Sequence, residues 1–357
     1  MRARRFLAVA VVVGGVLVSL PATAFAQTLV PCNGPALQSA VAATNAAGGG
    51  TLNLTPACTY TLTAPDNADN GLAVITTPIR INGNRATITR SSATDFRFFL
   101  VNGPGNLTLD ALTLANGRTD NGGAIRIGVD GRLTLSTSTV TGNTATVGAG
   151  GGIYSFDGTV EVNNSTLGNN TATQGGGFFN IFADATFNGS AVIDNHVIGE
   201  AVGGGINNVV GSVILNNTRI ADNDATFSGG SGDQSLGAGL ANGGTLTLIG
   251  SPVINNIANG PDAQGGGVWN IDTLNVTNSP IIGNAVIGTN ARGGGIHNGF
   301  GTATLQGVSV VTNRAVGSGA DGGGIFRADG TVTLSATSVA GNQPNNCGSS
   351  STVSGCS

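Results

Sequence analysis

The chain has 357 residues, of which 60 are Gly, 9% are charged and 4% are aromatic, and its 14 basic residues are all Arg. Gly at this frequency without a strict Gly-X-Y period excludes collagen, and a hydrophobic content of 40% excludes a disordered chain. So few charges and rings, with so many turn-forming residues, favour a repetitive β architecture.

Residues 1–26 have the order of a secretory signal peptide. A basic start is followed by an apolar run over residues 6–20 and by the small-residue site Ala24-Phe25-Ala26, after which we expect cleavage. A membrane anchor is the competing interpretation, but the run is short for a span of about 20 residues and breaks at Pro21. We therefore expect a secreted, extracellular bacterial protein with no membrane segment after cleavage.

Cleavage would remove three Arg and leave 11 against 18 acidic residues, a formal charge of −7. No basic patch indicates nucleic acid or anionic lipid as a partner.

Four cysteines lie in two pairs near the two ends of the chain: Cys32 with Cys58, and Cys347 with Cys356. Secretion permits disulfides, and three connectivities exist for four cysteines. Local pairing would staple each end of the chain, and this is the pairing we expect. Zinc is the alternative, but neither pair has the spacing of a metal finger, and His196 and His297 lie far away in the sequence.

The first part of the mature chain differs from the rest. Residues 36–47 have the pattern of a short amphipathic helix, Gly48-Gly49-Gly50 ends it, and residues 51–54 begin a strand. We interpret residues 27–63 as an N-terminal cap over the open end of a strand stack. Residues 64–118 contain irregular strands and look like the first rungs of that stack.

A Gly-rich motif of four residues, which we call the Gly word, then recurs eight times, with steps of 28, 25, 28, 34, 28, 28 and 29 residues. The words end at the apolar residues Ile125, Ile153, Phe178, Ile206, Leu240, Val268, Ile296 and Ile325. Each is followed by an alternating strand and, 16 to 18 residues later, by an Asn preceded at three residues by an aliphatic residue. These Asn are Asn143, Asn170, Asn195, Asn223, Asn256, Asn284, Asn313 and Asn342.

Three short strands per unit of about 28 residues predict one rung of a solenoid. Rungs bonded at about 4.8 Å form long parallel sheets, whose inward side chains stack in aliphatic and Asn ladders. The Gly triplets suit corners that need φ > 0 or a close backbone approach. We expect eight regular rungs over residues 119–343 and a Ser-rich, disulfide-bearing tail over 344–357. A propeller or sandwich would require antiparallel hairpins that the sequence does not show.

The helix, Gly-Gly-Gly and strand entry, followed by three-strand rungs, resembles the right-handed parallel β-helix superfamily that includes pectate lyases. The words Gly-Gly-Gly/Ala-Ile and aliphatic-x-x-Asn are similar to the repeats of polymorphic outer-membrane proteins, which are surface adhesins. The resemblance covers about residues 36–357 and implies an all-β right-handed parallel β-helix with a capping helix. It leaves function open, because the superfamily includes lyases, hydrolases and adhesins.

The residue after each inward apolar position should point outward. Down the eight rungs these residues are Arg126, Tyr154, Phe179, Asn207, Ala241, Trp269, His297 and Phe326. Tyr154, Phe179, Trp269, His297 and Phe326 form an outward column of rings on which sugar rings could stack. The alternative is that loops preceding the Gly triplets cover them. The next inward residues, Asn180, Asn208, Asn242, Asn270 and Asn298, should form a structural ladder.

A second candidate site lies beside the rung Asn. Asp194 and Asp222 occupy equivalent positions in adjacent rungs, as do His196 and Asp224, so the four side chains should lie close together. Two carboxylates and an imidazole could act as general acid and base, or the residues could simply decorate an exposed turn.

The sequence therefore predicts a secreted surface-recognition protein, adhesin-like or glycan-binding, that uses the ring column. A polysaccharide lyase or glycoside hydrolase at the Asp194/His196/Asp222/Asp224 patch is the alternative, and a structural cell-surface protein is a third. The motifs of pectate lyases and polygalacturonases are not matched. We expect no cofactor, no metal site and a monomer, with an extracellular polysaccharide or cell-surface glycan as partner.

Overall fold

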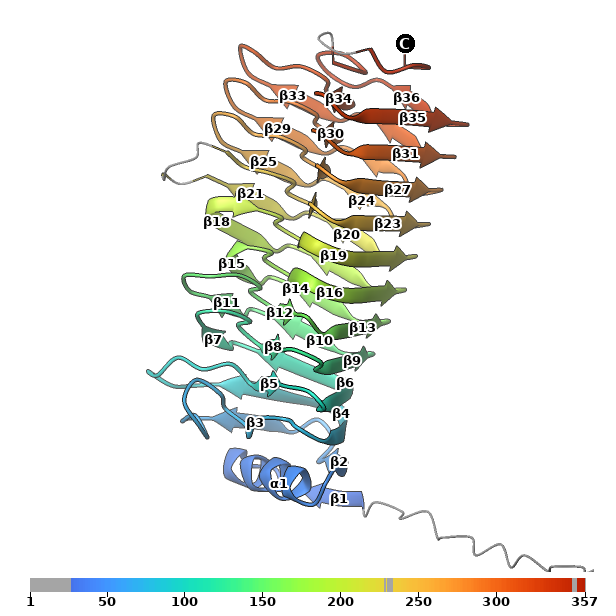
Figure 1. The fold of residues 1–357 in the computed structure, drawn as a ribbon. Coiled ribbons are helices and arrows are strands. Elements are labelled where there is room, and N and C mark those ends of the chain that lie inside the picture. The colour runs from blue at the N-terminus through green and yellow to red at the C-terminus, as the bar shows by residue number, and fades with distance from the viewer. Residues whose placement is uncertain (1–26, 228, 230–233, 349–351, 357) are drawn as a thin grey trace, which may run out of the picture.

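The computed structural model describes residues 27–227, 229, 234–348 and 352–356, so the expected signal peptide over residues 1–26 lies outside the described residues. The chain winds into a parallel β-solenoid of about 11 turns, which rises from the single helix at the blue end of Figure 1 to the red C-terminal end. Strands account for 53% of the chain and helix for 4%, which confirms the all-β class. Within the described residues no helix is both long enough and apolar enough to span a membrane.

The N-terminal cap is a helix laid across the first coil. Helix α1 (Gly34–Ala46) begins after Asn33, whose side chain accepts a hydrogen bond from the Ala36 amide at 2.8 Å. Its buried residues Leu37 and Val41 cover the core. The helix predicted over residues 36–47 is thus confirmed.

The strands stack in four columns, which we name front, lateral, back and outer; they are the centre, right, rear and left of Figure 1. The front column contains β5 (Phe99–Val101), β8 (Ile125–Ile127), β12 (Ile153–Phe156), the first halves of β16 (Phe178–Asn188) and β19 (Ile206–Asn216), β22 (Leu240–Asn242), β26 (Val268–Asn270), β30 (Ile296–Asn298) and β34 (Ile325–Arg327).

The lateral column contains β1 (Gln27–Val30), β2 (Gly50–Leu54), the first halves of β4 (Pro78–Arg90) and β6 (Asn106–Ala115), β9 (Arg132–Ser136), β13 (Thr159–Asn163), the second halves of β16 and β19, β23 (Thr245–Ile249), β27 (Thr273–Thr277), β31 (Thr302–Gln306) and β35 (Thr331–Ser335).

The back column contains β3 (Thr59–Leu62), the second halves of β4 and β6, β10 (Thr139–Thr141), β14 (Thr166–Gly168), β17 (Ala191–Ile193), β20 (Arg219–Ala221), β24 (Val253–Ile254), β28 (Ile281–Ile282), β32 (Ser309–Val311) and β36 (Ser338–Ala340).

The outer column contains β7 (Arg118–Thr119), β11 (Thr144–Ala145), β15 (Thr171–Gln174), β18 (His196–Val202), β21 (Asp224–Thr226), β25 (Ile257–Asn259), β29 (Ala285–Ile287) and β33 (Arg314–Val316).

A full regular rung has four strand segments where the sequence predicts three. The predicted three form the front, lateral and back columns of the large parallel sheet. The outer strands form a separate eight-stranded sheet. From β11 onward each begins directly after a rung Asn, whereas β7 follows Gly117. They were missed because they are only two to seven residues long and their inward residues are small, as at Ala172 and Ala258, which pack in a second, Ala-rich core.

The rung Asn form the inward ladder that the sequence predicts. From Asn143 to Asn313, each side-chain amide donates to the side-chain oxygen (Oδ1) of the Asn in the next rung at 2.9 to 3.0 Å. A second buried ladder joins Asn180, Asn208, Asn242, Asn270 and Asn298 at 2.7 to 2.9 Å, also as predicted. Since buried polar groups cost free energy unless they are paired, these ladders fix the register of the rungs.

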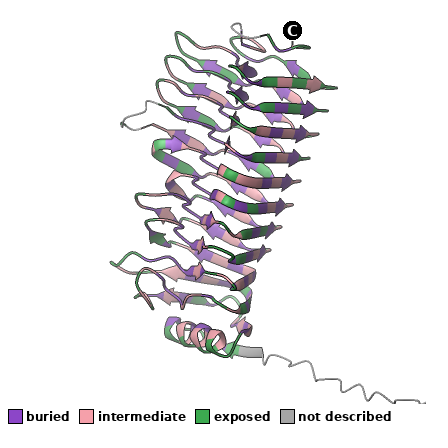
Figure 2. Cartoon of the chain, viewed as in Figure 1, coloured by how far each residue is buried: buried purple, intermediate pink, exposed green. Residues whose placement is uncertain are grey.

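The main core runs through the whole stack. Figure 2 shows buried residues alternating along the strands with partly buried and exposed ones. Both ends are stapled as expected, because Cys32 is bonded to Cys58 and Cys347 to Cys356. The C-terminal segment also pairs with the last rung, where the Ile325 amide donates to the Asn346 carbonyl at 2.9 Å.

Candidate binding face

The Gly words bend the chain from the outer column into the front column. The first glycine of every word has φ between +60° and +70°, a left-handed conformation that favours glycine. At the second position, a Cβ on Gly266 would lie 2.4 Å from the Ala285 carbonyl oxygen of an outer strand. At the third, a Cβ on Gly267 would lie 3.1 Å from the side chain of Asn284. The first glycine of the word therefore allows the turn, and the second and third allow the close approach of neighbouring rungs.

This bend places the residues just before the Gly words over the predicted ring column. Leu236, Gln264, Arg292 and Asp321 pair in parallel from rung to rung along the front face. Gln264 accepts a hydrogen bond from the Trp269 indole at 3.2 Å, and the Arg292 guanidinium lies over the Phe326 ring at 5.1 Å from its centroid. A polar rim therefore covers part of the column.

Of the two alternatives that the sequence left open for the ring column, exposure or cover, the structure shows cover for part of it. Phe179, His297 and Phe326 are buried, whereas Tyr154 and Trp269 are partly buried. The rings also cover one another, because Tyr154 stacks on Phe179 with centroids 5.1 Å apart and His297 stacks on Phe326 at 5.2 Å. Whether these five residues bind a ligand stays a prediction, and only Tyr154 and Trp269 among them present surface to solvent.

His297 is a buried imidazole in this column. Burial, and then the positive charge of Arg292, lower the pKa of His297 to about 4. Its Nδ1 atom has no hydrogen-bond partner in the structure. At neutral pH the imidazole is thus uncharged and packs as a ring against Phe326.

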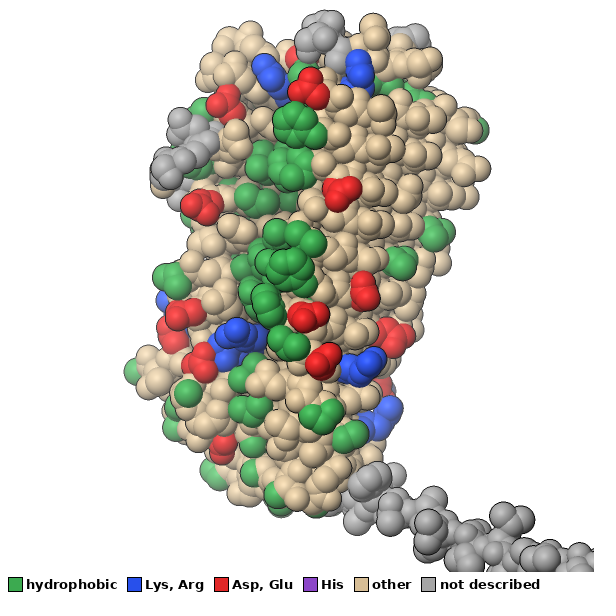
Figure 3. Space-filling model, viewed as in Figure 1, with side chains coloured by type: hydrophobic (Ala, Val, Ile, Leu, Met, Phe, Trp, Pro, Cys, Tyr) green, Lys and Arg blue, Asp and Glu red, His purple; other side chains and the backbone are tan. Residues whose placement is uncertain are grey.

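The exposed apolar surface lies further along each rung, at the turn that joins the front strand to the lateral strand. The side chains there are 76% exposed at Phe300, 57% at Phe182 and 48% at Val129. We call this line of turn residues the front ridge: Val129, Phe156, Phe182, Val210, Ile271 and Phe300. Figure 3 shows apolar side chains following one another up this face, with carboxylates beside them.

The front ridge spans seven rungs, or about 29 Å at about 4.8 Å per rung. Phe156 and Phe182 contact each other edge to face with centroids 6.0 Å apart, so adjacent rungs present a joined aromatic surface. The sequence analysis missed the front ridge. Its signal was an apolar residue three or four positions after the apolar end of six of the eight Gly words. The signal was obscured because this offset varies between rungs.

The four residues of the acidic patch lie at equivalent positions of two adjacent rungs. His196 and Asp224 are register partners on adjacent outer strands, as predicted, and Asp194 and Asp222 occupy equivalent corners next to paired strands. Asp222 forms an ion pair with Arg219 at 2.9 Å, and Asp224 accepts a hydrogen bond from Thr226 at 2.7 Å. Among the described residues no group of three or more His, Cys, Asp and Glu side chains could hold a metal ion. No observation favours a catalytic role for this patch.

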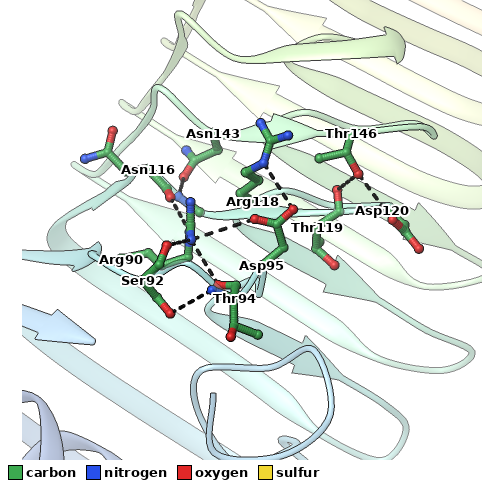
Figure 4. A network of polar contacts seen from close by, with 11 residues as sticks. Arg90, Ser92, Thr94, Asp95, Asn116, Arg118, Thr119, Asp120, Asn143 and Thr146 are labelled. Carbon is green, nitrogen blue, oxygen red and sulfur yellow. Dashed lines mark hydrogen bonds and ion pairs between the residues drawn. The ribbon is translucent and has the colours of Figure 1, made fainter. Parts of the chain in front are cut away.

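A third polar cluster joins the first irregular rungs to the regular ones (Figure 4). The Arg90 guanidinium donates to the Ser92 and Thr94 carbonyls at 2.6 and 3.0 Å, and Asp95 accepts from Arg118 at 3.1 Å. These partners satisfy one another within a loop and its neighbouring strand, so the cluster fixes the shape of this segment.

Beside that cluster Arg97 is buried and pairs with Asp69 at 2.5 Å. Burial raises the pKa of the Asp69 carboxyl, but the hydrogen bond and charge of Arg97 outweigh burial and hold that pKa below its usual range. The pair therefore stays ionised and links the loop of Asp69 to the first rungs.

One hollow lies at the C-terminal end of the described residues, away from the front ridge. It has a volume of about 630 Å³ and is lined mainly by residues 341–348 with Thr352, Val353 and Cys356. Its lining contains no ionisable side chain, since Cys347 and Cys356 are joined in the disulfide. The exposed aromatic and aliphatic side chains of the front ridge therefore make it the better candidate for a binding surface than this hollow.

Comparison with known proteins adds no relative to this description. No protein-family model matches the chain, and no curated protein and no solved structure matches it. The parallel β-solenoid is established by its strand pairing. The likeness to pectate lyases and to polymorphic outer-membrane protein repeats stays an expectation carried by the repeat words.

Proposed function

We propose that the protein recognises an extended saccharide on its front ridge, as a surface-recognition module of the adhesin-like or glycan-binding kind. The observation that carries the proposal is the exposure of Phe182 and Phe300 in a line of apolar turn residues. Contiguous apolar surface of this kind marks interaction sites on soluble proteins. The apolar faces of pyranose rings stack on aromatic side chains, and a chain of sugars can follow a straight line of them.

The shape of the face suits a long ligand. The ridge follows the stack and is built from the turn between the front and lateral strands. Six of seven successive rungs contribute an apolar side chain, and the rung of Leu240 has Gly243 and Gly244 there, so a polymer would meet a similar surface at most steps. The partly buried rings of Tyr154 and Trp269 lie on the same front strands, two residues before the turn begins, and extend the surface toward the outer column. Two disulfides are consistent with action outside the cell.

The test is affinity electrophoresis through gels that contain neutral, acidic or amino polysaccharides. We expect at least one polymer to retard the wild-type protein, and Phe182→Ala and Phe300→Ala each to weaken binding about three- to tenfold, the value of one aromatic stacking contact. Ile249→Ala is the matched control, because Ile249 is 45% exposed but lies at the far end of lateral strand β23. Absence of retardation in every gel, or equal retardation of all three variants, would contradict the proposal.

A further inference from the structure

Carboxylates accompany four of the seven rungs of the front ridge. The exposed Asp residues in or directly after these turns are Asp130, Asp157, Asp184 and Asp272, and Asp329 stands at the same place on the next rung beyond Phe300. Three of them lie on consecutive rungs, since the Asp130 amide donates to the Asp157 carbonyl at 2.9 Å and Asp184 is the register partner of Thr159. The ion pairs found among the described residues involve other Asp side chains.

The basic residues of the same rungs compensate this charge only in part. Arg126 and Arg327 are partly buried, with an Nε atom that has no partner, and Arg126 lies over the Tyr154 ring at 5.5 Å. Arg132 is exposed at the start of β9, near the lower end of the ridge. The turns that carry Asp157 and Asp184 contain no Arg. Apolar side chains of the ridge and carboxylates that make no ion pair among the described residues therefore lie together on the rungs of Asp157 and Asp184.

We propose that the saccharide is polycationic, an amino-sugar polymer with free, protonated amines. This inference rests on the proposed function and names the chemical class of its ligand. The apolar side chains of the ridge accept the ring faces, while the carboxylates attract the ammonium groups along one edge of the polymer. Complementary charge of this kind selects among ligands that would stack equally well.

The rings beside the carboxylates favour a sugar chain over a basic peptide. Phe156 and Phe182 contact each other edge to face on the rungs of Asp157 and Asp184, so an amino sugar can stack its ring face there while its amine reaches a carboxylate. A lysine side chain brings the charge without a ring. Asp184 pairs with Thr159, two residues after Asp157, so the two carboxylates are displaced along the strands as well as by one rung.

An acidic polysaccharide has the opposite relation to this surface. Its carboxylates would lie beside Asp157 and Asp184, and like charges placed side by side repel. A neutral or N-acetylated polymer would keep the stacking and lose the attraction. The three classes are thus ranked by charge, and the ranking is measurable.

The experiment compares the dissociation constants of a glucosamine oligomer, its fully N-acetylated counterpart of equal length, a uronic acid oligomer and an oligolysine, at about pH 5.5. We expect the free-amine oligomer to bind at least about tenfold more tightly than the N-acetylated one, and to weaken steeply from about 0.05 to about 0.5 M NaCl, because salt screens exposed charges.

The variant pair Asp157→Asn and Asp184→Asn, combined in one chain, should reduce this preference by up to about fivefold per removed charge. Asp66→Asn, the same change at an exposed residue in the first rungs, is the control and should leave the preference intact. Three results would overturn the inference. The first is equal binding of the amine and N-acetylated oligomers, and the second is tighter binding of the uronic acid oligomer or of oligolysine than of the free-amine oligomer. The third is an unchanged preference for the free-amine oligomer in the double variant.

The two proposals fail in distinguishable ways. If the N-acetylated or acidic oligomer binds best and Phe182→Ala weakens that binding, saccharide recognition stands and the polycationic ligand class is wrong. If none of the oligosaccharides binds, both proposals are wrong.

Discussion

The rung Asn ladder makes the strongest quantitative prediction about the fold. Asn223 is buried, and its side-chain amide donates to the Val192 carbonyl at 3.0 Å and to the Asn256 side-chain oxygen at 2.9 Å. Its own side-chain oxygen accepts from the backbone and the side-chain amides of Asn195 at 3.1 and 3.0 Å. One side chain therefore serves the rungs on both sides of it.

Asn223→Ala would leave the Asn195 backbone amide and the Val192 carbonyl without these partners inside the core. Each buried polar group left unpaired costs about 1–3 kcal/mol, so the expected loss of unfolding free energy is about 4 kcal/mol. A long repeat array need not unfold in a single step, so the assay is urea unfolding by circular dichroism together with amide hydrogen exchange in the rungs around residue 223.

Asn216→Ala is the matched control for this change. Asn216 also donates to an Asn of a neighbouring rung, Asn188 at 2.9 Å, but its ladder lies on the partly exposed face. Water can replace that partner, and the expected loss is about 1 kcal/mol or less. We reason that burial decides how much each ladder contributes to the free energy of unfolding. Equal losses of unfolding free energy in the two variants, or fast amide exchange found only in Asn216→Ala, would refute this reasoning.

Three further predictions concern the corners, the buried imidazole and the end staples. Gly266→Ala should abolish folding or lower the melting temperature sharply, because the new Cβ would lie 2.4 Å from a backbone oxygen, whereas Ala238→Gly at the equivalent position of another rung should cost about 1 kcal/mol or less; thermal unfolding compares them. The pKa of His297 is lowered to about 4, so the unfolded chain binds more protons than the folded chain between about pH 6.5 and pH 4, and stability should fall by about 3 kcal/mol as the pH drops through this window. In His297→Phe that part of the pH dependence should disappear from the urea midpoint, and its persistence would contradict the assignment. Replacing Cys32 and Cys58 by Ala opens a loop of 26 residues and should cost about 3.5 kcal/mol, with exchange rising first in α1.

The repeat words made the fold predictable because each carries a local physical requirement. The first glycine needs a left-handed φ, and the rung Asn needs partners above and below, so the period and the inward ladders could be worked out from residues such as Gly265 and Asn284. The outer strands could not be predicted from the sequence, because a strand such as β11 has only two residues and its one buried side chain is the small Ala145.

The binding face was predicted less well for a physical reason. Alternation shows that Phe179 and Phe326 point out of the rung, but it does not decide between exposure and cover by the chain preceding each Gly word, the two alternatives that the sequence left open. Phe182 and Phe300 lie at the bend between the front and lateral strand segments, where the alternation of inward and outward residues is interrupted, so the strand pattern does not indicate their exposure. Exposure is decided by how separate rungs pack together, which a single repeat does not contain.

The central claim, that the front ridge binds a saccharide, can be tested through Trp269, the only Trp in the chain. Its indole is partly buried on front strand β26, two residues before the ridge residue Ile271. The measurement is Trp fluorescence, with iodide quenching, during titration with the oligosaccharide that retards the protein most strongly. The account predicts a saturable change and reduced quenching, both weakened in Phe300→Ala and unchanged in Ile249→Ala. Binding that leaves the fluorescence and its quenching unaltered would place the ligand elsewhere and contradict the account.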